Sequence, residues 1–305
     1  MLVAIDHGNY AIKTPHDSFV AGLSQHSTRP PMAEEVLEYN DSFWTLSGQR
    51  LPYRRDKTRD ENYFILTLFA IAKELSRANN LQSSVRVELA VGLPPEHYGL
   101  LKDKFADYFK RSESIHFAYN GKPCTIMIRD VFVYPQSYAA IAPQKASLNH
   151  HLRVFLVDIG GYTTDVLLLR SGKPDMQFCR SLETGVITMN NDIIRRVGAL
   201  HDMQIEDEHI AAVLTGRETI LPEDVKKTIR CSAQDHAKYI LDGLRELMVD
   251  LRANPAVFIG GGSSLFREYL EKSPLVTSAS FVESTNANAA GYYAMAQAQL
   301  SLRSV

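Results

Sequence analysis

Two stretches of the sequence place an aspartate between an apolar strand and a glycine turn. In residues 155–169, Asp158 is followed by Gly160 and Gly161 and then by a second apolar strand. Paired glycines allow positive φ in a tight hairpin, and turn amides without a nearby Cβ can approach an anion closely. An aspartate beside such a turn suits hydrated Mg²⁺, which keeps several waters and takes few carboxylates. The stretch therefore predicts a site for a metal-bound phosphate.

The same order of residues occurs at the start of the chain. Residues 3–13 contain an apolar strand, Asp6, Gly8 and a second strand that ends at Lys13. Two such units, one early and one in mid-chain, predict two similar lobes that face each other across one phosphate site. For Lys13, an exposed position and a phosphate contact both remain open. We expect His7 to be a packed strand residue rather than a base.

Gln136 opens a predicted small-residue helix that leads directly into the mid-chain unit. It can make a local hydrogen bond at the helix start, or it can orient an attacking water. Its place just before Asp158 favours the second interpretation.

A third glycine turn, formed by Gly260, Gly261 and Gly262, lies between a strand and a helix that Ser263 would cap. Amides at such a helix start can hold a phosphate or a sugar edge. The turn has neither the Gly-Lys-Ser/Thr of a Walker A loop nor a Gly-x-Gly-x-x-Gly fingerprint.

The elements that position these residues follow from hydrophobic periodicity and turn signals. In the helix expected after Gly185, Asn190, Asn191 and Asp192 interrupt the apolar face, so they are either solvent-exposed or face a nucleoside. The mixed-charge run 54–60 is interpreted as a solvated loop, with an intermolecular contact as the alternative. The predicted helices cover 60–78 (with Asp60 as N-cap), 97–110, 186–197, 205–252 and a segment beginning at Asn286, and the predicted strands cover 36–39, 43–46, 85–91 and 131–133.

Bulk composition narrows the classes of function. The chain has 305 residues, 45% of them apolar and 22% charged, with a formal charge of −2, which predicts two domains and argues against a broad basic DNA-binding face. Three dispersed cysteines (Cys124, Cys179 and Cys231) are expected to be small buried residues in a reducing cytoplasm. We expect no signal peptide, no membrane span and no amphipathic membrane anchor, and hence a cytoplasmic protein without membrane contact.

Taken in order, five segments resemble the motifs of the actin, sugar-kinase and heat-shock-chaperone ATPase superfamily. They are residues 6–13 (first phosphate motif), 135–140 (first connecting helix), 158–165 (second phosphate motif), 260–263 (adenosine motif) and 286–291 (second connecting helix). Within that superfamily the chain most resembles the ParM-type bacterial actins, which are filament-forming ATPases of plasmid segregation. The similarity lies in the chain length, a short excursion at 24–60, the Gly92-Leu93-Pro94 turn, the Asp-x-Gly-Asn start and the 63–75 helix.

The resemblance implies a two-lobed α/β actin-like fold, built from duplicated ribonuclease-H-like domains with mixed sheets flanked by helices, and a nucleotide cleft. Lobe I would cover 1–150 with a small insertion at 24–60. Lobe II would cover 151–305 with a helical insertion at 186–252, and a C-terminal helix at about 286–302 would pack back toward lobe I. The implied cofactors are Mg²⁺ and ATP, with GTP left open.

The resemblance also implies a role for individual residues. Asp6 and Asp158 would hold the metal through water, and Gln136 would position the hydrolytic water. The nucleotide contacts would come from Gly8, Asn9 and Lys13 on the β- and γ-phosphates, from Gly160, Gly161, Tyr162 and Thr163 on the opposite side, and from Gly185, Asn190, Gly260, Gly261, Gly262 and Ser263 around the nucleoside.

The leading hypothesis is a cytomotive filament that ATP binding assembles and hydrolysis weakens. Its partners would be further copies of the chain and a small DNA-binding adaptor at a centromere-like plasmid site, without direct nucleic-acid contact. A small-molecule kinase of the same fold is the alternative, although no extra aspartate lies in a sugar-binding context to act as its base. A non-polymerising chaperone or division actin is the third, but no room remains for a peptide-binding domain and no amphipathic tail is present.

Overall fold

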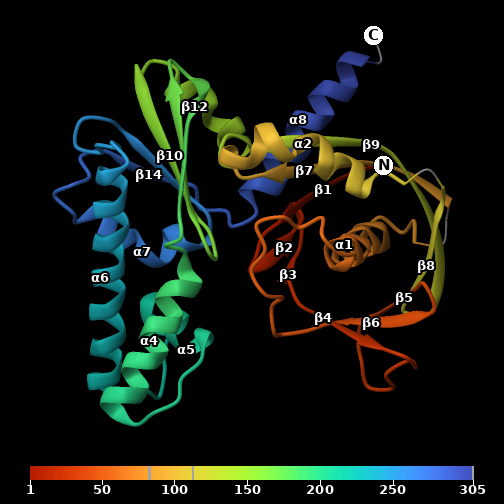
Figure 1. The fold of residues 1–305 in the computed structure, drawn as a ribbon, viewed down its shortest axis with the longest axis horizontal. Coiled ribbons are helices and arrows are strands. Elements are labelled where there is room, and N and C mark those ends of the chain that lie inside the picture. The colour runs from red at the N-terminus through yellow and green to blue at the C-terminus, as the bar shows by residue number, and fades with distance from the viewer. Residues whose placement is uncertain (82–83, 112, 304–305) are drawn as a thin grey trace. The chain divides into compact units, whose positions relative to one another are not determined.

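The computed structural model describes residues 1–81, 84–111 and 113–303, and the chain divides into two compact units (Figure 1). One unit comprises Met1–Pro143 together with Asn286–Val305, and the other is Gln144–Thr285. The last helix thus belongs to the first unit, although the whole second unit precedes it in the sequence. Among the described residues, no helix combines the length and the apolar character needed to cross a membrane.

A nine-stranded sheet forms the frame of the first unit, in the order β3-β2-β1-β7-β9-β8-β5-β6-β4. β1, β7 and β9 are parallel to one another, and the flanking pairs are antiparallel. The 24–60 excursion supplies β4, β5 and β6, so it extends this sheet. The strands are β1 (Leu2–His7), β2 (Ala11–Lys13), β3 (Ser18–Val20), β4 (Leu23–His26), β5 (Val36–Tyr39), β6 (Ser42–Leu46), β7 (Ser84–Leu93), β8 (Ile115–Tyr119) and β9 (Lys122–Pro135).

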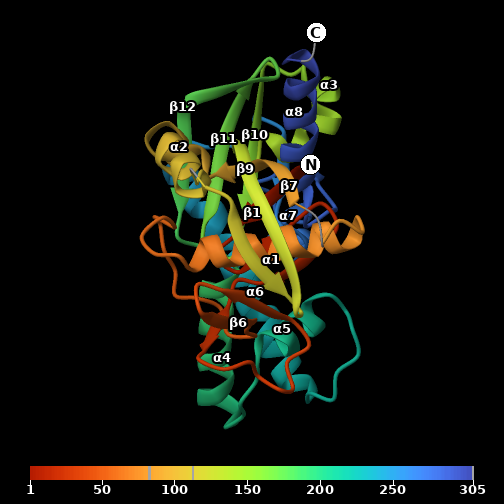
Figure 2. The same cartoon turned by 90° about the vertical axis from the view of Figure 1, so that its right-hand side faces the viewer.

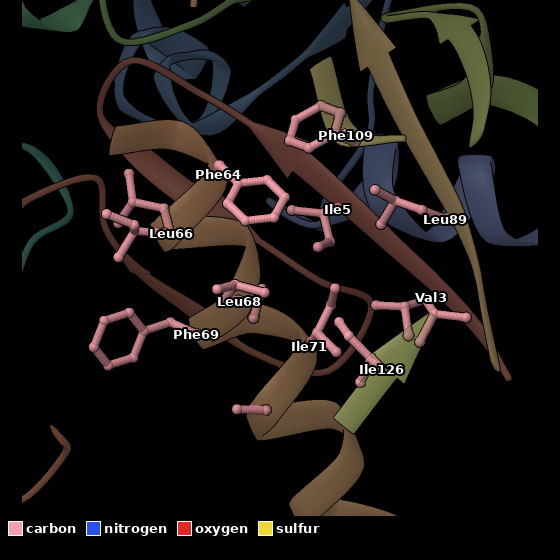
Figure 3. Close-up of a cluster of buried hydrophobic side chains, with 14 of the residues drawn as sticks. Val3, Ile5, Phe64, Leu66, Leu68, Phe69, Ile71, Leu89, Phe109 and Ile126 are labelled. Atoms are coloured by element: carbon pink, nitrogen blue, oxygen red, sulfur yellow. The ribbon is translucent and has the colours of Figure 1, made fainter. Parts of the chain in front are cut away.

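The curved sheet surrounds helix α1 (Asn62–Arg77), which Figure 1 shows end-on and Figure 2 from the side. Twelve of its sixteen residues are buried, which explains why its sequence is apolar on almost every face. In Figure 3, Phe64, Leu68 and Ile71 of α1 lie beside Val3 and Ile5 of β1. The expected N-cap is displaced by one residue. Glu61 occupies that position, and the Asp60 carboxylate instead accepts the backbone N–H of Asn62 at 3.1 Å.

The first unit is completed by α2 (Pro95–Phe109) and the C-terminal α8 (Ala287–Arg303). Small residues bring α8 close to its neighbours. A Cβ on Gly291 would lie 2.0 Å from the carbonyl oxygen of Ala139, and one on Gly92 of β7 would lie 2.0 Å from the Tyr292 hydroxyl. Glycine is therefore required at both positions.

The second unit contains a five-stranded sheet, in the order β12-β11-β10-β13-β14, with helices packed against it. β10 is antiparallel to β11 and parallel to β13. The helix predicted for 205–252 is two helices, and the longer one begins at Glu223, directly after Pro222. The 3₁₀-helix η1 (Ala139–Gln144) belongs to the first unit except for its last residue. The elements of the second unit are α3 (Lys145–Leu148), β10 (Arg153–Ile159), β11 (Thr164–Arg170), β12 (Lys173–Leu182), α4 (Val186–His201), α5 (Asp207–Leu214), α6 (Glu223–Glu246), β13 (Ala256–Ile259), α7 (Gly261–Glu271) and β14 (Ala279–Phe281).

Candidate functional site

Both units contain the hairpin that the sequence predicted, and the two hairpins are built alike. In β1–β2, Asp6 lies directly opposite Lys13, and in β10–β11, Asp158 lies directly opposite Asp165. Each aspartate therefore pairs with the residue seven positions later. Asp6 is 6% exposed and Asp158 is 8% exposed. Directly opposed residues share one face of a sheet, so each hairpin brings two ionisable groups together on one side.

The glycines of these turns act through close approach rather than through unusual dihedrals. Gly160 lacks the positive φ that we expected for the paired glycines, and the φ of Gly8 is not positive either. A Cβ on Gly8 would lie 2.6 Å from the carbonyl oxygen of Ala11, so the tight turn itself excludes a side chain there. The Asn9 side chain of the same turn accepts a hydrogen bond from the Tyr63 hydroxyl at 3.3 Å.

Gln136 lies against the first hairpin. Its side-chain Nε2 donates to Asp6 Oδ1 at 2.7 Å, so two of the three predicted catalytic residues meet in this unit. The helix predicted to begin at Gln136 is absent at that position: β9 ends at Pro135, a turn follows, and the 3₁₀-helix η1 begins at Ala139. Ser137, with a φ of 64°, interrupts helical geometry in between.

His7 is a packed residue, as predicted. Its ring is fully buried and stacks on Phe109, and Nε2 lies 2.7 Å from the Thr67 hydroxyl oxygen. Because the Thr67 hydroxyl donates to the Tyr63 carbonyl, Nε2 must be the protonated nitrogen. Burial, reinforced by the charge of Lys57, lowers the pKa of His7 to about 3, so the imidazole is neutral.

The 54–60 run is not a simple solvated loop, which corrects the sequence interpretation. Lys57 is buried, and its ammonium donates to the His7 carbonyl just before the Gly8 turn. Arg54 pairs with Asp60, and Asp56 pairs with Lys104 at 2.6 Å. A single lysine of a charged run can be buried when its ammonium finds an acceptor, and a hydrophilicity pattern does not reveal this.

The second hairpin holds two carboxylates where the first holds an opposite-charge pair. Asp158 and Asp165 are both buried, and like charges directly across a strand pair are destabilising. The Thr163 hydroxyl donates to Asp165 Oδ2 at 2.9 Å and offsets part of this repulsion. Gly260, with a φ of 86°, leaves room for Asp158, because a Cβ there would lie 2.4 Å from Asp158 Oδ1. This arrangement fits a hydrated cation.

The start of α4 is attached to the second hairpin turn. The amides of Gly185, Val186 and Ile187 donate to the carbonyls of residues 162, 160 and 161 at 2.9, 3.1 and 2.7 Å. The amides of residues 186 and 187 therefore already have hydrogen-bond acceptors within the chain. One turn further, Asn190 is 5% exposed, and its Oδ1 accepts no hydrogen bond from the described part of the chain. A buried acceptor in this state fits a ligand donor.

The third glycine turn precedes α7 in the second unit. No described atom comes within 4 Å of a Cβ built on Gly261, whereas a Cβ on Gly262 would meet Ile159 and Val186. Ser263 does not cap the helix as predicted, because its hydroxyl donates to the Gly260 carbonyl at 2.7 Å and accepts no helix amide. Open space beside Gly261 suits the close approach of a ligand.

Two residues in these sites were not identified from the sequence: Asp165 and Lys57. For Asp165 a signal was present, since the separation of Asp6 from Lys13 recurs between Asp158 and Asp165. The described residues contain no cluster of three or more His, Cys, Asp or Glu that could hold a metal directly. A cation held through water by few carboxylates is compatible with that finding.

Two family models match the chain. Residues 156–272 match the C-terminal model of the archaeal actin homologue MreB-like family, and residues 40–138 match the N-terminal domain model of actin-like proteins. No curated protein sequence matches.

Several solved structures share the fold over almost their whole length. The archaeal actin homolog Ta0583 aligns with a TM-score of 0.78 at 18% identity, covering 97% of this chain and 99% of its own, and it has also been solved with ADP. A Clostridium botulinum ParM, solved as a 15-stranded filament, aligns with a TM-score of 0.74 at 16% identity over 97% and 99%. Bacillus thuringiensis ParM with AMPPNP aligns with a TM-score of 0.68 at 13% identity over 98% and 99%. The fold predicted from the sequence is confirmed.

Proposed function

This chain has the actin-like fold, and from that premise we propose that it is a magnesium-dependent ATPase whose nucleotide state controls filament assembly. The observation that carries the proposal is the repeated hairpin, with a buried carboxylate at the same register in each unit. In this proposal both hairpins serve one nucleotide. Asp6 and Asp158 hold magnesium through water. The phosphates are contacted by Gly8, Asn9 and Lys13 from one unit and by Gly160, Gly161, Tyr162 and Thr163 from the other.

Gln136 is suited to orienting the attacking water. Its Nε2 is committed to Asp6, so its side-chain carbonyl oxygen can accept a proton of a water. A water held in this way can approach the γ-phosphorus in line with the leaving oxygen. The Lys13 ammonium, on the same face as Asp6, adds positive charge toward the phosphates. Magnesium, when bound, supplies further positive charge that stabilises the developing charge on the phosphate oxygens.

The second unit offers contacts for the nucleoside. Gly185, Asn190 and the 260–263 turn form this part of the proposal. Asn190 Oδ1 is an acceptor that can bind an N–H donor of the ligand. Because adenine and guanine both carry an exocyclic amino group, ATP and GTP both remain candidates, and parallel sedimentation with each nucleotide distinguishes them.

Assembly into filaments is supported by structural neighbours that were solved as filaments, a Clostridium botulinum ParM and Alp12. Contacts with a γ-phosphate and its metal can hold a protein segment in one of two conformations. Hydrolysis removes these contacts, so the segment can change conformation and weaken the contacts between subunits. We further propose plasmid DNA segregation in the cytoplasm as the task, with a small DNA-binding adaptor as the partner. The formal charge of −2 favours an adaptor over direct DNA binding.

Sedimentation and right-angle light scattering test the proposal. We expect pelleting with Mg²⁺·ATP or a non-hydrolysable analogue, and less with ADP or with EDTA. A parallel series with GTP decides nucleotide preference, and Gln136→Ala should pellet with ATP but release phosphate slowly. A soluble monomer that transfers phosphate to a sugar or acetate would establish the kinase alternative instead. A monomer that hydrolyses ATP at every protein concentration would exclude assembly.

A further inference from the structure

Helix α8 reaches the turn that carries Gln136. Asn288, in the first turn of α8, is 7% exposed, and its Oδ1 accepts a hydrogen bond from the backbone N–H of Ser137 at 2.9 Å. Ser137 is fully buried and has a φ of 64°. A non-glycine residue keeps this left-handed conformation only where its surroundings impose it. The Asn288 bond is one of the contacts that impose it.

The other side of the turn is fixed to the sheet. The Gln136 amide donates to the carbonyl of Leu93, the last residue of β7, at 2.8 Å, and the Tyr138 amide donates to the Gln136 carbonyl at 2.6 Å. The Gln136 backbone is thus held from β7 on one side and, through Ser137, from α8 on the other. From this backbone the side chain reaches Asp6 Oδ1.

Asn288 is itself held in place. Close packing of Gly291 against Ala139 and of Tyr292 against Gly92 leaves α8 no room to shift toward the sheet. The Tyr292 ring also stacks on Tyr134, near the end of β9, with ring centroids 6.3 Å apart. The acceptor for the Ser137 amide therefore comes from a rigid support.

We propose that Asn288 is a positioning residue for nucleotide hydrolysis. By holding Ser137 in the left-handed conformation, it sets the direction in which the Gln136 side chain leaves the backbone, and so the orientation of the water that Gln136 holds. Asn288 acts through this turn. The inference rests on the proposed function, since it assigns a residue to the hydrolysis step of the same site.

The test compares Asn288→Ala with Asn288→Asp, which keeps a side-chain oxygen as acceptor. Gln299→Ala is the matched control, because Gln299 on the same helix accepts a hydrogen bond from the Tyr134 hydroxyl at 3.0 Å without touching the turn. Phosphate release is measured per pelleted subunit, so that an assembly defect is not mistaken for slow hydrolysis. Affinity is measured separately with a fluorescent ATP analogue.

We expect Asn288→Ala to lower kcat roughly ten- to a hundredfold, because small misplacements of a positioned group cost that much. Nucleotide affinity should change by less than about twofold, since Asn288 only positions the turn. Asn288→Asp and Gln299→Ala should stay within about threefold of the parent kcat. Adding Ser137→Gly to Asn288→Ala should restore much of the rate, because glycine adopts positive φ without support.

An unchanged kcat in Asn288→Ala overturns the inference, and so does a loss of affinity equal to the loss of kcat. If Asn288→Ala does not fold, Asn288→Ser replaces it, since its shorter side chain cannot reach the amide. A parent protein that binds and hydrolyses no nucleotide would refute the proposed function itself. An active parent whose kcat is unchanged in Asn288→Ala would refute only the role of Asn288.

Discussion

The two hairpins differ in the residue that faces the aspartate. Asp6 faces Lys13, a residue of opposite charge, whereas Asp158 faces Asp165, whose Oδ2 accepts a hydrogen bond from the Thr163 hydroxyl. Like charges on directly opposed residues are destabilising, so a cation beside these two buried carboxylates is favoured. The second hairpin is therefore the one in which loss of an aspartate should affect the nucleotide cycle most directly.

Replacing Asp158 by alanine tests this role. Filaments should still form at Mg²⁺·ATP concentrations high enough to offset a weakened affinity, but phosphate release should slow by roughly a hundredfold, the usual effect of removing one group that stabilises the transition state. A coupled phosphate-release assay beside light scattering measures both. Asp175→Ala, which removes a carboxylate paired with Arg170 in the same sheet, is the control. Normal turnover in Asp158→Ala would contradict the assigned role.

His236 on α6 makes folding stability depend on pH. Its Nε2 donates to the Thr184 carbonyl at 3.1 Å, and its ring stacks on Phe266. Burial lowers the pKa of His236 below its usual 6.5, although the bond to Thr184 favours the charged form. The unfolded chain therefore binds a proton at a higher pH than the folded chain, so the free energy of unfolding falls as pH drops below about 6.5.

The variant His236→Phe keeps the stack and removes the titration. Its free energy of unfolding should decline less than that of the parent between pH 7 and pH 5, after a loss of about 1 kcal/mol at pH 7 from the missing hydrogen bond. Urea unfolding at several pH values measures both curves. His116→Phe, at an exposed strand position, should leave the slope as it is in the parent. Parallel curves for His236→Phe and the parent would exclude this contribution.

The junction between β13 and α7 depends on a single backbone conformation. Gly260 has a φ of 86°, and its missing Cβ makes room for Asp158. Gly260→Ala should cost about 1–3 kcal/mol of unfolding free energy from backbone strain, and more where Asp158 must move. Gly261→Ala is the matched stability control, since its φ is ordinary and no described atom is near. Urea unfolding should separate the two, and equal stability would show that the junction tolerates a side chain.

The sequence predicted elements well where the signal is local. The strand at 36–39 and the buried helix α1 follow from the spacing of apolar residues over a few positions. Prediction from the sequence failed where the local structure depends on a residue that is distant in the chain. The turn after Gln136 depends on Asn288, 151 residues from Ser137, and Lys57 is buried because it meets the His7 carbonyl 50 residues away.

The site residues divide in the same way. Asp6 and Gln136 were predicted, and their contact fits the assigned roles. The positive φ expected for the paired glycines is absent at Gly160, where a Cβ would instead lie 3.3 Å from the carbonyl oxygen of Thr163. Cys231 was expected to be buried, but it lies on the exposed side of α6, and no pattern around a single cysteine shows which side of a helix it will occupy.

For the whole molecule, the repeated hairpin makes a prediction that neither unit makes alone. A ligand that binds only the folded state stabilises it by about 2.7 kcal/mol at a hundred times its Kd. Mg²⁺·ADP, at protein concentrations too low for assembly, should therefore raise the Tm of the chain by several degrees.

If one nucleotide uses both hairpins, Asp6→Asn and Asp158→Asn should each remove most of this rise, and the double variant should lose little more. If each hairpin bound its own nucleotide, every single variant would keep about half of the rise and the two losses would add. Differential scanning fluorimetry with and without Mg²⁺·ADP distinguishes the two cases. Asp250→Asn, an exposed partner of Arg252, should respond to the nucleotide as the parent does. The non-additive outcome requires both aspartates to contact the same metal-bound phosphates, so this experiment tests the shared-nucleotide proposal independently of filament assembly and hydrolysis.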